Sequence, residues 1–159
     1  MLENKRTLTG EAATKLILAT FRINGLLLDA GDLLSADKGL TSARWQVLGA
    51  IALAERPLTV PQIARRMGLT RQSVHATVRR LAGDGLVELT PNVDHRRSPL
   101  VRLTQQGSAK YQAIDTRQAA WVNRLARGIG RSDIETAWSV LDELCRRLEA
   151  DSGNEAETG

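Results

Sequence analysis

The 159-residue chain contains one cysteine and two histidines, and this scarcity excludes several kinds of site. Cys145 has no second cysteine with which to form a disulfide within the chain. Its place on the apolar stripe of a predicted helix favours a small hydrophobic role over redox sensing. Two histidines and one cysteine cannot build a histidine-rich or cysteine-rich metal centre, so no metal or other cofactor is expected.

Long apolar segments and enzyme motifs are also missing. The longest apolar run, residues 47–54, is far shorter than the roughly 20 residues that a membrane-spanning helix needs. The first residues lack the basic and then apolar layout of a signal peptide, so we expect a soluble cytoplasmic protein. Neither a glycine-rich phosphate loop nor a Gly-x-Ser-x-Gly turn is present, and we expect no enzymatic activity.

What the sequence does contain is a concentration of arginine. Residues 59–104 include eight arginines, no lysine and three acidic residues, a net charge of +5 in a chain whose total is +4. The planar guanidinium group suits phosphate oxygens and guanine edges better than an ammonium group does. Charge alone leaves two interpretations open, a nucleic-acid contact and a solvated basic face.

Helix start and stop signals predict six helices. Residues 11–36 carry apolar residues at spacings of three and four. Five further helices are expected to begin at capping residues, at about 41–54, 59–67, 70–83, 104–126 and 132–150. The last is attributed to a capping box of Ser132 and Glu135. The polar and acidic residues 151–159 are expected to be a disordered tail.

Two short helices joined by a three-residue turn and followed by a hairpin predict a winged helix-turn-helix. On the second helix, Val74, Val78 and Leu81 share one face, which must be the buried one. The opposite face is rich in hydrogen-bond donors and poor in carboxylates. Such a helix fits a major groove about 12 Å wide, where Gln and Arg pair with adenine and guanine edges. The alternative is a surface helix that is merely polar.

The hairpin tip, with sequence PNVDHRRSPLV, favours the DNA interpretation. Arginines on an exposed turn beyond a recognition helix can enter the minor groove or contact phosphates. The predicted contacts to double-stranded DNA come from the recognition helix and the tip: Thr70, Arg71, Gln72, Ser73, His75, Arg79, Arg80, Arg96 and Arg97.

The run LTVPQIARRMGLTRQSVHATVRRLAGDGLVEL, followed by DHRRSPLVRLTQQG, resembles the MarR (multiple antibiotic resistance regulator) family. The segment LTSARWQVL before it and the Leu-Thr-x-x-Gly pattern of Leu103, Thr104 and Gly107 are similar too. The resemblance covers roughly residues 11–150. It implies homodimeric DNA-binding transcription regulators, commonly repressors that small ligands release from DNA, whose dimer is made by the first and last helices.

The resemblance gives the domain organisation and fold class. Residues 1–159 form a single unit, mostly α-helical with a small β-hairpin wing. The DNA-binding lobe is expected at 41–103, and the dimerisation helices at 11–36 and 104–150. A heptad of apolar residues in the last helix, Ile134, Leu141 and Leu148, supports a homodimer, although a helical hairpin within one chain is the alternative. A two-fold dimer implies a near-palindromic operator, with recognition helices roughly 34 Å apart.

The sequence departs from the family pattern in two places, the wing and the recognition helix. Family wings usually carry Asp-x-Arg at a fixed distance before Leu-Thr, but here His95 stands in the place of the aspartate and Arg97 in that of the arginine. Asp94 and Arg96 restore the pattern one residue earlier, so both arginines remain candidates for the tip contact. His75 is followed by Ala76 where many relatives have Ser or Thr and then Arg, which indicates a different operator preference.

Relatives bind ligands, often aromatic acids, between the dimer helices and the DNA-binding lobe. The resemblance therefore implies a small aromatic or anionic effector, with Phe21, Arg22, Arg44 and Trp45 as candidate ligand-binding residues. Neither arginine has an obvious acidic partner nearby in the sequence, although both can simply face solvent and the two aromatic residues can belong to the core. The alternative function is a winged-helix protein-interaction module without sequence-specific DNA binding.

Overall fold

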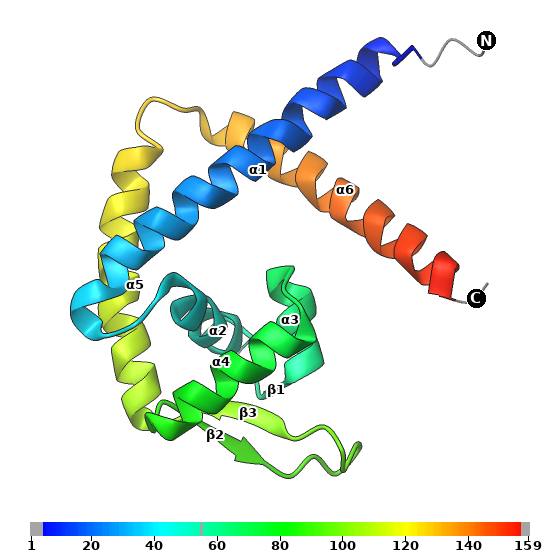
Figure 1. The fold of residues 1–159 in the computed structure, drawn as a ribbon. Helices are drawn as coiled ribbons and strands as arrows, with labels where there is room; N and C mark the ends of the chain where they lie inside the picture. Colours follow the sequence, from blue (N-terminus) through cyan, green and yellow to red (C-terminus); the bar gives the residue numbers. More distant parts are fainter. Residues whose placement is uncertain (1–4, 55, 157–159) are drawn as a thin grey trace. The chain divides into compact units, whose positions relative to one another are not determined.

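The computed structural model describes residues 5–54 and 56–156, with side-chain surroundings up to residue 151. The elements, in chain order, are α1 (Leu8–Ser35), the 3-10 helix η1 (Ala36–Lys38), α2 (Ser42–Ala52), β1 (Leu58–Thr59), α3 (Val60–Met67), α4 (Arg71–Gly83), β2 (Val87–Thr90), β3 (Leu100–Leu103), α5 (Gln105–Leu125) and α6 (Arg131–Ala156). This mostly helical fold with a small sheet confirms the predicted fold class (Figure 1). Among the described helices, none has the length and hydropathy needed to cross a membrane.

Two compact units make up the chain, Met1–Gln118 and Ala119–Gly159. The first contains α1 to α4, the sheet and the start of α5, and the second contains the end of α5 and α6. The winged helix-turn-helix predicted at 41–103 therefore lies within the first unit.

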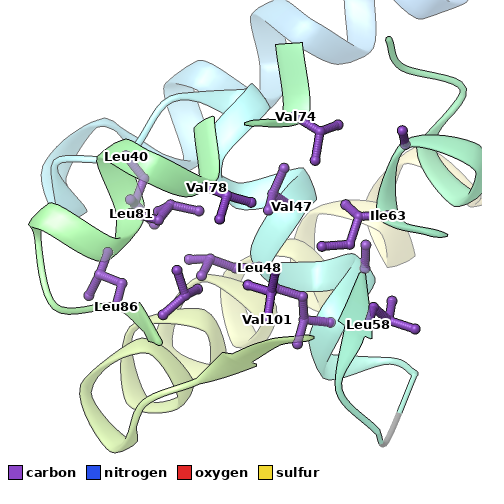
Figure 2. Packing of buried hydrophobic residues seen from close by; sticks show 14 of the residues in the cluster. Leu40, Val47, Leu48, Leu58, Ile63, Val74, Val78, Leu81, Leu86 and Val101 are labelled. Atoms are coloured by element: carbon purple, nitrogen blue, oxygen red, sulfur yellow. The ribbon is translucent and has the colours of Figure 1, made fainter. Parts of the chain in front are cut away.

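An aliphatic core holds the first unit together. Leu48 of α2, Ile63 of α3 and Val101 of β3 are completely buried in it (Figure 2). Ile114 of α5 is completely buried in the same core. Burying one such side chain is worth roughly 1.5–3 kcal/mol relative to leaving it exposed. The predicted inward face of α4, formed by Val74, Val78 and Leu81, belongs to the same core. Burial of this face orients the opposite face of α4 outward.

Capping residues set the helix-turn-helix, as the sequence predicted. Thr59 and Gln62 form a reciprocal capping box in which the Thr59 backbone N–H donates to Gln62 Oε1 over 2.8 Å. Gly68 ends α3 in the left-handed region, with φ 61°, where residues other than glycine are strained. Thr70 begins α4, and its Oγ1 accepts from the Ser73 backbone N–H over 3.1 Å. These caps fix the three-residue turn between the two helices.

The wing sheet has the strand order β1-β3-β2, with both pairs antiparallel. The predicted hairpin of β2 and β3 is confirmed, and its register pairs Val87 with Leu103 and Thr90 with Leu100. The two-residue strand β1 pairs Leu58 with Val101 and was not predicted. A strand this short leaves no alternating pattern to detect.

The Leu-Thr-x-x-Gly pattern joins the base of the wing to α5. Thr104 Oγ1 donates to the Gly85 carbonyl over 2.7 Å and accepts from the Gly107 backbone N–H over 3.0 Å. A Cβ atom at Gly107 would lie 1.8 Å from the Leu86 carbonyl oxygen. The glycine is therefore required by the close approach of α5 to the backbone that leads into β2.

Three predicted boundaries were wrong. Thr7 caps α1, which begins at Leu8 rather than at residue 11. Helix α6 begins at Arg131, so Ser132 lies inside it and the Ser132–Glu135 capping box does not form; instead Glu135 pairs with Arg131 over 2.6 Å. Helix α6 also continues to Ala156, into the segment 151–159 that was expected to be a disordered tail. Residues 157–159 lie outside the described part of the chain.

An ion pair links η1 to α5. Arg117 Nη1 lies 2.5 Å from Asp37 Oδ1, and both side chains are about half exposed. The hydrogen bond from this guanidinium holds the pKa of the Asp37 carboxyl below its ordinary value. The contact joins segments that are 80 residues apart in the sequence.

Candidate DNA interface

The outward face of α4 is exposed as predicted. Its N-cap Thr70 and the residues that follow on this face are all solvent-accessible: Arg71, Gln72, Ser73, His75, Ala76, Arg79 and Arg80. Five of them surround a shallow hollow of about 490 Å³: Gln72, His75, Ala76, Arg79 and Arg80. The burial of Val74, Val78 and Leu81 on the opposite side prevents α4 from turning this face inward.

A second hollow, of about 480 Å³, lies between α4 and the wing. Arginines from separate segments are among the residues that line it, with Arg71 and Arg79 from α4 and Arg97 from the wing. The other residues that line it are Val60, Pro61, Gln72, His75, Val78, Leu89, Ser98 and Pro99. None of these lining residues is acidic, so the hollow has the charge and the donors to hold a phosphate group.

The structure distinguishes the two wing arginines. Both are exposed, but only Arg97 is among the residues that line the hollow beside α4. Among the described residues, no ion pair joins Asp94 to Arg96 or Arg97, so the carboxylate does not brace either side chain. Arg97 is therefore the wing arginine that lines a hollow together with α4.

The loop of the wing, residues 91–99, is ordered by hydrogen bonds of its own. The Asn92 side-chain amide donates to the Ser98 carbonyl over 2.9 Å, and Asn92 Oδ1 accepts from the Asp94 backbone N–H over 3.2 Å. The Ser98 backbone N–H donates to the His95 carbonyl over 2.9 Å. Asn92 was not among the residues predicted from the sequence, although asparagine in a turn commonly accepts a hydrogen bond from the backbone N–H two residues later.

Residues at the start of α3 were also missed. Val60 and Pro61 line the hollow opposite α4, and Pro61 lies in the first turn of α3. Proline is favoured there because the first N–H groups of a helix have no partner inside it. The capping box at Thr59 placed this turn correctly, but nothing in the sequence showed that it faces the wing.

The acidic residue at the C-terminal end of α4 is neutralised by α2. Asp84 is the C-cap of α4 and forms an ion pair with Arg44 Nη2. Arg44 Nη1 also donates to the Gly39 carbonyl over 3.2 Å, and the Arg44 side chain is only 19% exposed. No acidic partner for Arg44 is evident nearby in the sequence, and the fold brings Asp84 to it from 40 residues away.

The four candidate ligand-binding residues fall into two groups, Phe21 and Arg22 on α1 and Arg44 and Trp45 on α2. Phe21 and Arg22 are exposed on α1, and Phe21 is 71% exposed. Trp45 packs against the core, and a Cβ atom at Gly31 of α1 would contact its ring at 3.6 Å. Since α1 rises about 1.5 Å per residue, Gly31 is about 15 Å along the helix from Phe21.

Groups of histidine, cysteine, aspartate and glutamate that could hold a metal were not found in the part of the chain that the structure describes. Cys145 is exposed on α6. This differs from the buried position that the sequence pattern suggested for it.

Comparison with protein families matches residues 38–98 to a family model described as MarR family. The matched segment runs from the end of η1 through α2, α3, α4 and β2 into the wing loop. It therefore contains all the residues of α4 that line either hollow.

Comparison with curated proteins gives relatives along most of the chain. The uncharacterized protein Rv2011c of Mycobacterium tuberculosis is 39% identical over 137 residues, which cover 86% of this chain and 94% of that protein. The transcriptional activatory protein BadR of Rhodopseudomonas palustris is 28% identical over 123 residues, covering 72% of this chain and 70% of BadR.

Comparison with solved structures shows the same fold. The transcriptional regulator BldR from Sulfolobus solfataricus aligns with a TM-score of 0.77 and 20% identity, over 89% of this chain and 99% of BldR. CouR from Rhodococcus jostii RHA1, solved with p-coumaroyl-CoA bound, aligns with a TM-score of 0.73 and 22% identity, over 89% of this chain and 96% of CouR.

Proposed function

The chain belongs to the MarR family of DNA-binding, non-enzymatic transcription regulators, and from that premise we propose that it is a homodimeric repressor released from a near-palindromic operator by a small ligand. In this proposal residues 41–103 are the DNA-binding lobe, and the helices at 11–36 and 104–150 make the dimer. The observation that carries the DNA-binding part of the proposal is that Arg71, Arg79 and Arg97 line one hollow whose lining residues include no carboxylate.

In the DNA complex, α4 lies in the major groove. Gln72 and Arg79 are exposed on its outward face and can each make two hydrogen bonds to a base edge, adenine for glutamine and guanine for arginine. Arg97 projects from the wing beside α4, where it contacts a phosphate or enters the neighbouring minor groove. Many relatives have an arginine at the position of Ala76. In this chain the alanine methyl group can instead contact the methyl group of a thymine.

Exposed apolar side chains on α1 and α6 support a homodimer. Leu18, Phe21 and Leu26 of α1 are each more than half exposed, and so are Trp138 and Leu148 of α6. Exposed large apolar side chains along a helix commonly mark an interface, and each of these two helices carries such side chains. A second copy of the chain covers both helices in this proposal, and Trp138→Asp is expected to turn the dimer into a monomer in light-scattering measurements.

A small ligand is proposed as the effector because CouR was solved with p-coumaroyl-CoA, an aromatic acyl thioester. The proposed binding residues are Phe21, Arg22, Arg44 and Trp45. Trp45 Nε1 is buried without a hydrogen-bond partner among the described residues, so it is free to donate to a ligand. An anionic ligand at Arg44 would compete with Asp84 for the guanidinium group. Because Asp84 is the C-cap of α4, this competition would act directly on the end of α4.

Ligand release has a thermodynamic test. If an aromatic acid weakens operator binding, operator DNA must weaken binding of that acid by the same factor, typically 5–150-fold. Tryptophan fluorescence measures the ligand titration with and without DNA. An acid that binds equally well in both titrations is not the effector.

The name of BadR favours a second candidate, an activator. The two roles differ in the position of the bound site relative to the promoter rather than in the protein surface. Transcription in vitro from the upstream DNA of the gene separates them, since a repressor lowers transcript yield when added and an activator raises it.

A direct test of DNA binding is a fluorescence-anisotropy titration of an operator duplex and a shuffled duplex at several salt concentrations. An operator is obtained by selecting binding sites from random-sequence DNA. We expect tighter binding to the operator and a log–log salt slope that grows by about 0.9 for each phosphate contacted. Equal affinity for both duplexes would favour the alternative of a protein-interaction module.

A further inference from the structure

We propose that Asn92 is the positioning residue of the wing, and that it acts on DNA binding through Arg97. This inference rests on the proposed contact between the wing and DNA. Asn92 is 8% exposed, whereas Val93 beside it is 96% exposed. A buried amide in a solvent-facing loop requires hydrogen-bond partners, because a buried donor without one costs about 1–3 kcal/mol.

Both ends of the Asn92 amide are used. The NH₂ group donates to the Ser98 carbonyl over 2.9 Å, and the oxygen accepts from the Asp94 backbone N–H over 3.2 Å. One side chain therefore connects the outgoing limb of the loop to the returning limb. The connection spans six residues and encloses both arginines, Arg96 and Arg97.

The returning limb is fixed where it matters for the DNA contact. Ser98 directly follows Arg97, and both line the hollow that also receives Arg71 and Arg79. The Ser98 carbonyl is held by Asn92 and its backbone N–H by the His95 carbonyl, over 2.9 Å each. With both polar groups of the next residue bound, the backbone at Arg97 has little freedom to turn the guanidinium away from α4.

A neutral amide makes this brace, since Asp94 forms no ion pair with either arginine among the described residues. Salt screens ion pairs on a protein surface but leaves a buried amide hydrogen bond largely unaffected. The wing should therefore keep its shape at high salt, and the salt slope of binding should report phosphate contacts alone.

The test is a double-mutant cycle on the full-length protein with Asn92→Ala, Arg97→Ala and the combined variant. Operator affinity is measured by fluorescence anisotropy at several salt concentrations. One phosphate contact with a slope of about 0.9 is worth about eight-fold in affinity at 0.1 M salt relative to 1 M. We expect each single variant to lose affinity up to that factor and to lower the slope by up to 0.9. The combined variant should match Arg97→Ala alone.

Three controls separate positioning from a general loss of structure. Asp94→Ala changes the same loop without touching the brace and should not weaken binding. Asn92→Asp keeps the acceptor for the Asp94 N–H but loses the donor to Ser98. It also adds a negative charge, whose effect on affinity is measured by making the same change in the Arg97→Ala background. After that effect is subtracted, Asn92→Asp should lose as much affinity as Asn92→Ala. In an Arg96→Ala background, the full effect of Asn92→Ala should remain. Thermal unfolding should show that every variant is still folded at the temperature of the binding assay.

The outcomes are distinguishable. An effect of Asn92→Ala that persists undiminished without Arg97, or no effect at all, would overturn the positioning role while leaving the wing contact intact. If Arg97→Ala itself changes neither the affinity nor the salt slope, the proposed wing contact is wrong, and the role of Asn92 is wrong with it.

Discussion

Replacing Gly107 with alanine should destabilise the first unit strongly. The new Cβ atom would lie 1.8 Å from the Leu86 carbonyl oxygen, about 1.5 Å closer than an ordinary carbon–oxygen contact. The obstacle is backbone, so α5 or the segment before β2 must move. Such a movement pulls on two hydrogen bonds, from the Thr104 N–H to the Leu86 carbonyl over 3.1 Å and from Thr104 Oγ1 to the Gly85 carbonyl over 2.7 Å.

The magnitude follows from these contacts. Overpacking typically costs about 1–3 kcal/mol, and each of the two hydrogen bonds is worth about 1 kcal/mol. Alanine has a higher helix propensity than glycine, which offsets up to about 1 kcal/mol of this loss. We therefore expect a net loss of about 2–4 kcal/mol in the free energy of unfolding.

The assay is urea unfolding followed by circular dichroism at one fixed protein concentration. Gly83→Ala is the matched control, because a Cβ atom at this helical position meets nothing within 4 Å. The control should be neutral or stabilising by up to about 1 kcal/mol. Equal behaviour of the two variants would refute the argument that close backbone approach explains the glycine of the Leu-Thr-x-x-Gly pattern.

Three further predictions concern the DNA contacts and an ion pair. Gln72→Ala and Arg79→Ala should each cost about 1–3 kcal/mol on the operator and little on shuffled DNA in anisotropy titrations; equal losses on both would make these residues phosphate contacts. Replacing Arg96 and Arg97 together with alanine should weaken binding to every duplex and flatten the salt slope, and an unchanged slope would show that the wing does not touch the backbone. Asp37→Asn should lower the urea midpoint at neutral pH. Because the pKa of Asp37 is lowered in the folded protein, this difference should vanish as the pH falls through that pKa, and a difference that persists in acid would exclude the Arg117 pair as its cause.

Local signals in the sequence were sufficient for the helix-turn-helix. Thr59 with Gln62, Gly68 and Thr70 act on residues next to them, so their effect can be read without knowing the fold. The inward face of α4 was predicted for the same reason, since its spacing of three and four residues is a property of one helix.

Contacts between distant segments could not be predicted in this way. The pair of Arg44 with Asp84 depends on how α2 packs near the end of α4. That Arg97 rather than Arg96 lines the hollow beside α4 depends on the conformation of the whole wing loop. Both are results of the tertiary structure, and neither leaves a periodic pattern along the chain.

The continuation of α6 to Ala156 shows a different limit. Residues 151–156 are polar and include a glycine, so their composition indicated disorder. Extending an existing helix requires no new nucleation step and adds one hydrogen bond per residue. Whether such a segment is helical therefore depends on the helix before it, and the composition of the segment alone does not reveal this.

The central claim, a two-fold dimer that reads DNA with α4 and the wing, is tested most directly by selecting binding sites from random-sequence duplexes with the full-length protein. The account predicts enrichment of an inverted repeat whose half-site centres are about 10 base pairs apart, and loss of that enrichment for a Gln72→Ala, Arg79→Ala variant. Selection of a single unsymmetrical site, or no enrichment over the starting pool, would contradict it.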